Sequence, residues 1–389
     1  MDIEERRARL GRRHGLAPGT AAASPVEAAG QVVALHATDP ASVHLSAAAR
    51  MRAPDPAVVA SALYEERTLV RMLGMRRTMF VLPVELAPVV QAACTSAIAE
   101  RERRRLVARL EGAGIARDAA RWLAEVEDAT LRALAARGEA AAVELSADVP
   151  RLRERVLMAE GKPYEAWQNI STWVLSLLSA DGRIVRGRPR GSWISSQYRW
   201  AVLADWLPEG REEWTPERAE EELVRRWLGA FGPGTVADLR WWTGWTMGRT
   251  RAALARVGPA EVDLGGGGAG LALADDLERE VAPGPWVALL PALDATPMGW
   301  SERGWFLGEH RAALFDRSGN VGPTVWSDGR VVGGWAQRAS GEIAIRLLED
   351  VGADARAGID AAVARMAAWI GDIRFMPRFR TPLERELSA

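Results

Sequence analysis

Three polar side chains of chemically useful types lie close together near the N-terminus, in the sequence His36-Ala37-Thr38-Asp39-Pro40. Proline biases the residue before it toward an extended conformation, and residues two apart in an extended chain point to the same side. His36 and Thr38 could therefore share one face, where an imidazole beside a hydroxyl and a carboxylate can hold and activate a water molecule. Spacing alone favours a simpler explanation, the end of a helix, because Asp-Pro is a turn dipeptide.

Other kinds of chemistry find little support in the sequence. The segment Gly265–Gly270 matches G-x-G-x-x-G, but no strand precedes it and no helix follows it, so we interpret it as a turn. Lys162 is the only lysine and follows no phosphate-binding loop. Cys94 is the only cysteine, and the four histidines lack the spacing of metal ligands. We therefore expect no metal and no cofactor.

The positive charge is unevenly distributed along the chain. The 389 residues carry 50 basic and 51 acidic side chains, so any site for a polyanion must be a local patch. Three stretches contain at least four arginines each and no acidic residue: 67–84, 182–204 and 239–260. Chance clustering in an arginine-rich chain is the alternative, but three such stretches favour a surface that binds nucleic acid.

The acid-free stretches coincide with the expected wings and recognition helices of a repeated pattern. Helices are predicted over 25–37, ending at Pro40, and over 55–65, followed by two β-forming runs joined by Gly74-Met75. Short helices followed by a hairpin are typical of a winged helix. Similar groups follow: helical segments over 84–137 and 166–180 with a strand–turn–strand over 182–195, then helices over 215–231, 235–242 and 248–257 with a hairpin over 261–274.

The C-terminal part is predicted to be rich in β-structure. Short strands are expected over 286–290, 312–315, 324–326, 330–337 and 343–348, with a hairpin turn at Asp328-Gly329 and a closing helix over 355–370. The predicted fold class is α+β, with three tandem winged-helix units and a small C-terminal β-barrel. The predicted boundaries are 1–84, 85–206 and 215–284 for the winged helices, and 285–389 for the barrel with its terminal helix.

Five stretches resemble the bacterial alkylpurine and interstrand-crosslink DNA glycosylase family, tandem winged-helix proteins with a member that protects an azinomycin producer. They are LHATDPASVHLSAAAR (35–50), LVRMLGMRRTMFVLPVE (69–85), WLGAFGPGTVADLRWWTG (227–244), LPALDATPMGWSERGWFLG (290–308) and LFDRSGNVGPTVWSDGRVVGGWAQR (314–338). The resemblance spans almost the whole chain. It implies three winged helices around a concave DNA-binding face and a small barrel.

The resemblance also implies where catalysis takes place. In the characterised glycosylases, a Gln-x-Gln or Gln-x-Asp motif positions the water that attacks the anomeric carbon, and it corresponds to His36-Ala37-Thr38 in this chain. The family's Arg-Gly-Thr-Leu-His corresponds to Arg76-Arg77-Thr78-Met79-Phe80. Because both polar positions of the first motif differ, the chain is either a divergent glycosylase or a relative that binds DNA without cleaving it.

We expect a monofunctional DNA glycosylase that hydrolyses the N-glycosidic bond of alkylated purines, in DNA repair or in self-resistance to a genotoxin. His36 and Thr38 would position the attacking water, and Asp39 would be the nearest anion to an oxocarbenium-like transition state. A non-catalytic DNA-binding protein and a transcriptional regulator remain as alternatives.

The expected partner is double-stranded DNA, alkylated or crosslinked, bound by a monomer in the cytoplasm. No apolar run of ~20 residues is present, so no membrane partner is expected. The residues expected to contact DNA are Arg71, Arg76, Arg77, Thr78, Arg183, Arg186, Arg188, Arg190 and Arg240.

Overall fold

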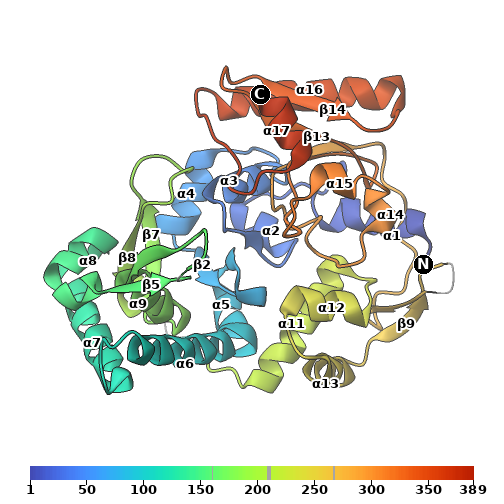
Figure 1. Ribbon diagram of the computed structural model, residues 1–389. Coiled ribbons are helices and arrows are strands. Elements are labelled where there is room, and N and C mark those ends of the chain that lie inside the picture. Colours follow the sequence, from blue (N-terminus) through green and yellow to red (C-terminus); the bar gives the residue numbers. More distant parts are fainter. Residues whose placement is uncertain (160, 208–211, 266–267) are drawn as a thin grey trace.

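The structure, a computed structural model, describes residues 1–389 except 160, 208–211 and 266–267 (Figure 1). Its N-terminal part combines helices with a three-stranded antiparallel sheet of order β1-β3-β2. The elements are α1 (Ile3–Arg13), α2 (Pro25–Gly30), β1 (Leu35–His36), α3 (Pro40–Ala48), α4 (Pro56–Tyr64), β2 (Leu69–Leu73) and β3 (Met79–Pro83). The helix predicted over 55–65 and the hairpin that follows it are confirmed.

The helix predicted over 25–37 is wrong beyond Gly30. The chain turns through Val33, which has a positive φ of 65°, and then pairs with β3 as the short strand β1. Pro40 begins α3 rather than ending a helix, because proline fits the first turn and the Asp39 side chain caps it. The residues of interest therefore lie between a strand and a helix N-terminus.

The next part of the chain has its own hydrophobic core, built from residues between 99 and 200. Its elements are α5 (Ala87–Val90), α6 (Ser96–Gly112), α7 (Ala119–Arg137), β4 (Glu139–Ala141), α8 (Ala142–Asp148), β5 (Arg155–Met158), β6 (Ala166–Asn169), α9 (Ile170–Ala180), β7 (Ile184–Pro189), β8 (Tyr198–Val202) and α10 (Leu203–Trp206). Strands β4, β8 and β7 form a second three-stranded sheet. The predicted strand pair over 182–195 is confirmed for β7, but its partner begins later, at Tyr198.

Three helices and a two-stranded hairpin follow, as predicted. They are α11 (Pro216–Phe231), α12 (Val236–Thr243), α13 (Met247–Val257), β9 (Ala260–Asp263) and β10 (Ala269–Ala272). Part of the G-x-G-x-x-G segment, residues 266–267, lies outside the described residues. Of the described remainder, Gly265 and Gly268 lie between the two strands and residues 269–270 begin β10, which agrees with a place in the middle of a hairpin.

The C-terminal strands form an open antiparallel sheet of order β11-β12-β13-β14, and the described strands close no barrel. The elements are β11 (Val287–Leu290), α14 (Gly304–Leu307), α15 (Arg311–Leu314), β12 (Thr324–Ser327), β13 (Arg330–Gln337), β14 (Ile343–Leu347), α16 (Gly352–Ile370) and α17 (Pro382–Ser388). The strand predicted over 312–315 is wrong, since these residues overlap α15. The apolar face of α16 packs on this sheet at the top of Figure 1. One face of the open sheet is therefore covered by a helix and not by further strands.

A buried ion pair joins the N-terminal part to the C-terminal sheet. Arg50 and Asp294 are both fully buried and form a bidentate pair, with N–O distances of 2.8 and 2.7 Å. Ser46 and Thr296 form further hydrogen bonds with the two charged groups. Burial alone would raise the pKa of Asp294, but Arg50 and the hydrogen bonds hold it below its usual value. Each charge thus stabilises the other at a position that solvent water does not reach.

We predict that Asp294→Ala lowers the free energy of unfolding by about 3–5 kcal/mol, because it leaves the Arg50 guanidinium buried and unpaired. Urea unfolding measures the change. The double variant Arg50→Met with Asp294→Leu should lose much less, since no buried charge remains. Glu221→Ala, which breaks the exposed pair with Arg225 on α11, serves as the control and should cost no more than about 1 kcal/mol.

Candidate functional site

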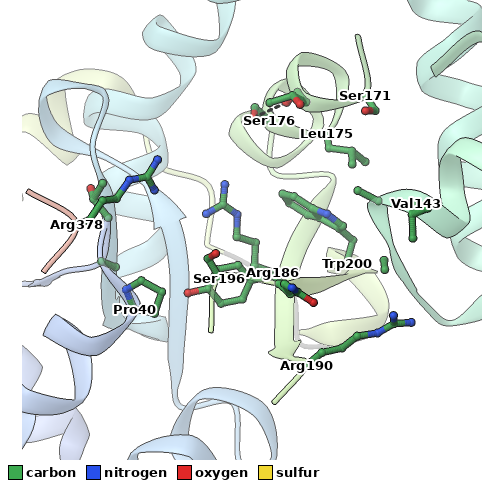
Figure 2. A pocket seen from close by; sticks show the side chains of 17 residues that line it. Pro40, Val143, Ser171, Leu175, Ser176, Arg186, Arg190, Ser196, Trp200 and Arg378 are labelled. Atoms are coloured by element: carbon green, nitrogen blue, oxygen red, sulfur yellow. Dashed lines mark hydrogen bonds between the residues drawn. The ribbon is translucent and has the colours of Figure 1, made fainter. Parts of the chain in front are cut away.

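A cavity of about 520 Å³ opens between the N-terminal part and the β7–β8 hairpin (Figure 2). Its walls come from Ala37, Thr38 and Pro40, from the first residues of α8, one face of α9 and both strands of the hairpin, and from Arg378 in the segment before α17. Of the described residues, no aspartate or glutamate lines it. Segments far apart in the sequence therefore meet at one positively charged hollow.

His36 lies beside this cavity without lining it. The side chain is only 6% exposed, and its ring packs edge-to-face on Phe80, its partner in the β1–β3 pairing. Its Nδ1 atom accepts the N–H of Thr38 at 3.5 Å. Burial, followed by the nearby charge of Arg76, lowers the pKa of His36 to about 3. The imidazole is therefore neutral at physiological pH, so it can donate or accept a hydrogen bond but is a weak base.

Thr38 does line the cavity, and its hydroxyl forms no hydrogen bond within the described part of the chain. Asp39 is 6% exposed and does not line it. The two carboxylate oxygens of Asp39 accept the N–H groups of Ala41 at 3.1 Å and Arg378 at 2.9 Å. Asp39 thus caps α3 and holds the segment that carries Arg378. The shared face expected for His36 and Thr38 is not observed, because β1 ends at His36 and only Thr38 reaches the cavity.

A second cavity of about 530 Å³ adjoins the first, between α6, α9 and the β2–β3 turn. The two cavities share Thr172, Ser176 and Arg186 in their walls, so they lie side by side, and we call the pair of cavities the arginine groove. The arginines that line the groove are Arg77, Arg105, Arg109, Arg186, Arg190 and Arg378. Of the described residues, Glu102 is the one carboxylate in the lining.

Three of the arginines predicted to contact DNA line the groove, and their charges are compensated to different degrees. Arg77 pairs with Glu102 at 2.8 Å, and Arg190 pairs with Glu144 at 3.0 Å. Arg186 forms no ion pair with any described residue. Burial lowers the pKa of Arg186 to about 10, which still leaves it charged at neutral pH. Arg186 is therefore the least compensated of the three.

Three other predicted contacts lie outside the groove. Arg188 pairs with Glu65 at 2.7 Å and lines a separate small cavity. Arg183 lies 3.7 Å from Asp128. Arg240 is exposed on α12 and lines neither cavity of the groove. Their role in binding DNA stays a prediction.

The remaining predicted contacts shape the β2–β3 turn and the floor behind the cavity. Arg71 is buried and donates to the carbonyl of Ala37 at 2.8 Å. Arg76 has a positive φ of 53° and stacks on the Trp241 ring, 3.8 Å from its centroid. Thr78 is half-buried where the turn enters β3. Arg71 and Arg76 are thus placed to position neighbouring groups.

The sequence analysis missed Arg105, Arg109, Arg378 and Tyr198, which also line the groove. Arg105 and Arg109 are spaced i, i+4 on the long helix α6 and so share a face, a signal that the sequence contains. Arg378 and Tyr198 reach the groove through tertiary packing, which no local pattern predicts.

No group of three or more His, Cys, Asp or Glu side chains is placed to hold a metal ion in the described ranges. Across the same residues, no helix is long and apolar enough to cross a membrane. The lining of the groove offers guanidinium and hydroxyl groups, the donors that bind phosphate and orient water.

Fold and site together define a mixed helix-and-strand protein with a cationic groove suited to a polyanion. The chain belongs to the AlkZ-like DNA glycosylase family, whose model matches residues 29–369. An interstrand DNA cross-link repair glycosylase of Streptomyces sahachiroi is 29% identical over 174 residues, which cover 42% of this chain and 45% of that protein. The solved structure of Streptomyces sahachiroi DNA glycosylase AlkZ has the same fold, with a TM-score of 0.72, 21% identity and coverage of 94% of this chain and 96% of that chain.

The buried histidines predict that acid destabilises the protein. Burial lowers the pKa values of His14, His36 and His44 to about 3, against 6.5 in an unfolded chain. Between these pH values the unfolded state binds more protons, so stability falls as the pH drops below 6.5. We expect a slope of about 1.4 kcal/mol per pH unit for each histidine in urea unfolding between pH 6 and 4.5.

His44→Gln should remove about a third of that slope. A stability that does not vary with pH over this range would contradict the burial of three neutral imidazoles.

Proposed function

We propose that the protein is a DNA glycosylase that hydrolyses the N-glycosidic bond of alkylated purines in duplex DNA. The observation that carries this proposal is the arginine groove, whose two adjacent cavities are lined by residues from the β2–β3 turn and by Thr38. Arginine binds phosphate through its fork of N–H donors. A DNA backbone that follows the groove would be led to the position that corresponds to the family's catalytic motif.

The proposed architecture is three winged-helix units, 1–84, 85–206 and 215–284, followed by residues 285–389. In support, the first two segments each contain helices and a three-stranded antiparallel sheet, and the third contains three helices and a hairpin. The arginine groove lies where the first two sheets approach each other, since β2 packs against β7 and α9. The wings of two units would thus grip the same stretch of DNA.

The proposed chemistry needs little assistance to the leaving group, because an alkylated purine already carries a positive charge. Water attacks the anomeric carbon, the N-glycosidic bond breaks with its electron pair going to the base, and the water proton passes to solvent. Thr38 orients the water through its free hydroxyl, and the neutral imidazole of His36 supports the segment behind it. Asp39 supplies a fixed negative charge one residue away and keeps Arg378 in place.

One observation favours a second candidate, a non-catalytic DNA-binding protein. His36 is buried beside the cavity and the carboxylate of Asp39 is occupied by two backbone N–H groups, so Thr38 alone of the three reaches the cavity. A protein of this kind, or a transcriptional regulator, would use the same groove and release no base.

The groove predicts a specific salt dependence of DNA binding. Arg105→Ala with Arg109→Ala should weaken binding to undamaged duplex, and the slope of log affinity against log salt should fall by about 0.9 for each phosphate that the variant no longer neutralises. Arg101→Ala with Arg104→Ala is the matched control, since both residues are exposed on the same helix and line neither cavity. Equal slopes for the two double variants would exclude this part of the groove from the interface.

The proposed activity predicts that base release depends on residues 36 and 38. Thr38→Ala and His36→Ala should each lower single-turnover excision from methylated duplex by ~10² or more, while Thr38→Ser should retain most of the rate. Binding to undamaged duplex should barely change, and thermal unfolding checks the fold. Restoring the family residues with His36→Gln and Thr38→Gln should preserve excision. No excision by the wild-type protein from methylated or crosslinked DNA would favour the non-catalytic alternative.

A further inference from the structure

Three hydrogen-bonding groups gather at the floor of the first cavity without partners. The hydroxyl of Tyr198 and the Nε atoms of Arg71 and Arg186 are buried and have no hydrogen-bond partner among the described residues. The guanidinium carbons of Arg71 and Arg186 lie 4.9 and 5.5 Å from the centroid of the Tyr198 ring. Because a buried polar group without a partner costs ~1–3 kcal/mol, such a concentration needs an explanation.

The same floor concentrates positive charge. Arg186 and Arg378 extend toward the same open space from opposite walls of the cavity (Figure 2). Neither arginine forms an ion pair with a described residue, and none of the described carboxylates lines the cavity. After burial, the charges of Arg71 and Arg378 are what lower the pKa of Arg186 further. The cavity therefore holds like charges whose mutual repulsion destabilises it when it is empty.

We propose that Arg186, Arg378 and Tyr198 form a clamp for a single phosphate group, with Arg71 as a fixed positive charge behind them. The terminal nitrogens of Arg186 form no hydrogen bond with the described residues, so they are free to bind two phosphate oxygens. Tyr198 supplies a third donor from its unpartnered hydroxyl. One anion in this position would compensate the guanidiniums that face it.

Stacking alone does not account for this arrangement. The Arg186 guanidinium also lies 5.2 Å from the Trp200 ring, which fixes its orientation. An aromatic face provides no counter-charge, however, and Arg188 on the same strand shows the alternative, since it stacks on Tyr64 and also pairs with Glu65. Two arginines of one strand therefore differ: a carboxylate neutralises Arg188, whereas no described carboxylate pairs with Arg186.

The ligand that we propose for the clamp is a phosphodiester of the DNA backbone next to the extruded nucleotide. This identification of the ligand rests on the proposed function. A flipped nucleotide must be held out of the duplex against the loss of stacking and pairing. A phosphate fixed beside Thr38 would hold the attached sugar at the cavity that the proposed reaction uses. The groove would attract DNA through its positive charge, and the clamp would in addition position the target nucleotide.

The test uses the full-length protein and two probes, inorganic phosphate and thymidine 5′-monophosphate, with thymidine as the uncharged comparison, all at constant ionic strength. Calorimetry and thermal unfolding measure binding. Arg186→Gln should weaken phosphate binding at least tenfold, and Tyr198→Phe and Arg378→Gln severalfold. Arg104→Gln is the control, because Arg104 pairs with Glu100 and lines neither cavity, and it should bind the probes as the wild-type protein does. Tyr198→Phe should unfold at the same temperature or a higher one, because it removes a buried unpartnered hydroxyl.

Two results would overturn the clamp: no binding of either phosphate probe by the wild-type protein at millimolar concentration, or equal affinities for Arg186→Gln and Arg104→Gln. The phosphate-binding test can succeed or fail independently of the test of glycosylase activity. Phosphate binding that depends on Arg186, in a protein that excises no base, supports the clamp and contradicts the glycosylase activity. Excision of bases by a protein that binds neither phosphate probe supports the activity and contradicts the clamp.

Discussion

The buried ion pair between Arg50 and Asp294 is the constraint on which the rest of the structure depends. Arg50 follows the last turn of α3, and Asp39 caps its first turn, so one short helix connects the ion pair to the cavity. Asp39 in turn holds the backbone of Arg378, which comes from the opposite end of the chain. Because the pair is fully buried, a shift of α3 relative to the C-terminal sheet would separate charges that water cannot reach. The position of the cavity wall at Thr38 and Arg378 therefore depends on an ion pair that lies outside the cavity.

Arginine has two distinct uses in this chain. On most of the surface it pairs with a neighbouring carboxylate, as Arg188 does with Glu65, and such exposed pairs contribute little to stability. In the groove the balance changes, since the lining holds six arginines and one described carboxylate, Glu102, and only Arg190 pairs with a described carboxylate beyond the lining, Glu144. A nearly neutral protein can thus carry a locally strong positive potential, which attracts a polyanion at the expense of its own stability. The arginines of the groove therefore serve binding and do not stabilise the fold.

The sequence predicts the parts of this account that depend on local patterns. Asp55-Pro56 and the run before Gly74 identify α4 and the β2–β3 hairpin, and the strand–turn–strand pattern over 182–195 identifies β7. It fails at Leu35-His36, because a two-residue strand exists only through pairing with β3, and helical spacing continues through it. It also fails to bring Tyr198 and Arg378 to the cavity, because packing between residues hundreds of positions apart leaves no local trace. The resemblance to a glycosylase family located Thr38, which spacing alone had assigned to a helix end.

The central claim is that the target nucleotide enters the cavity between Thr38 and Arg186. A crystal structure of the complex with duplex DNA containing a 1-azaribose nucleotide, a stable mimic of the oxocarbenium-like transition state, tests it most directly. The account predicts that the cationic sugar ring lies beside Thr38, with an adjacent phosphate on Arg186 and the flanking backbone along α6. An analogue bound elsewhere on the protein, with the arginine groove exposed to solvent, would contradict it.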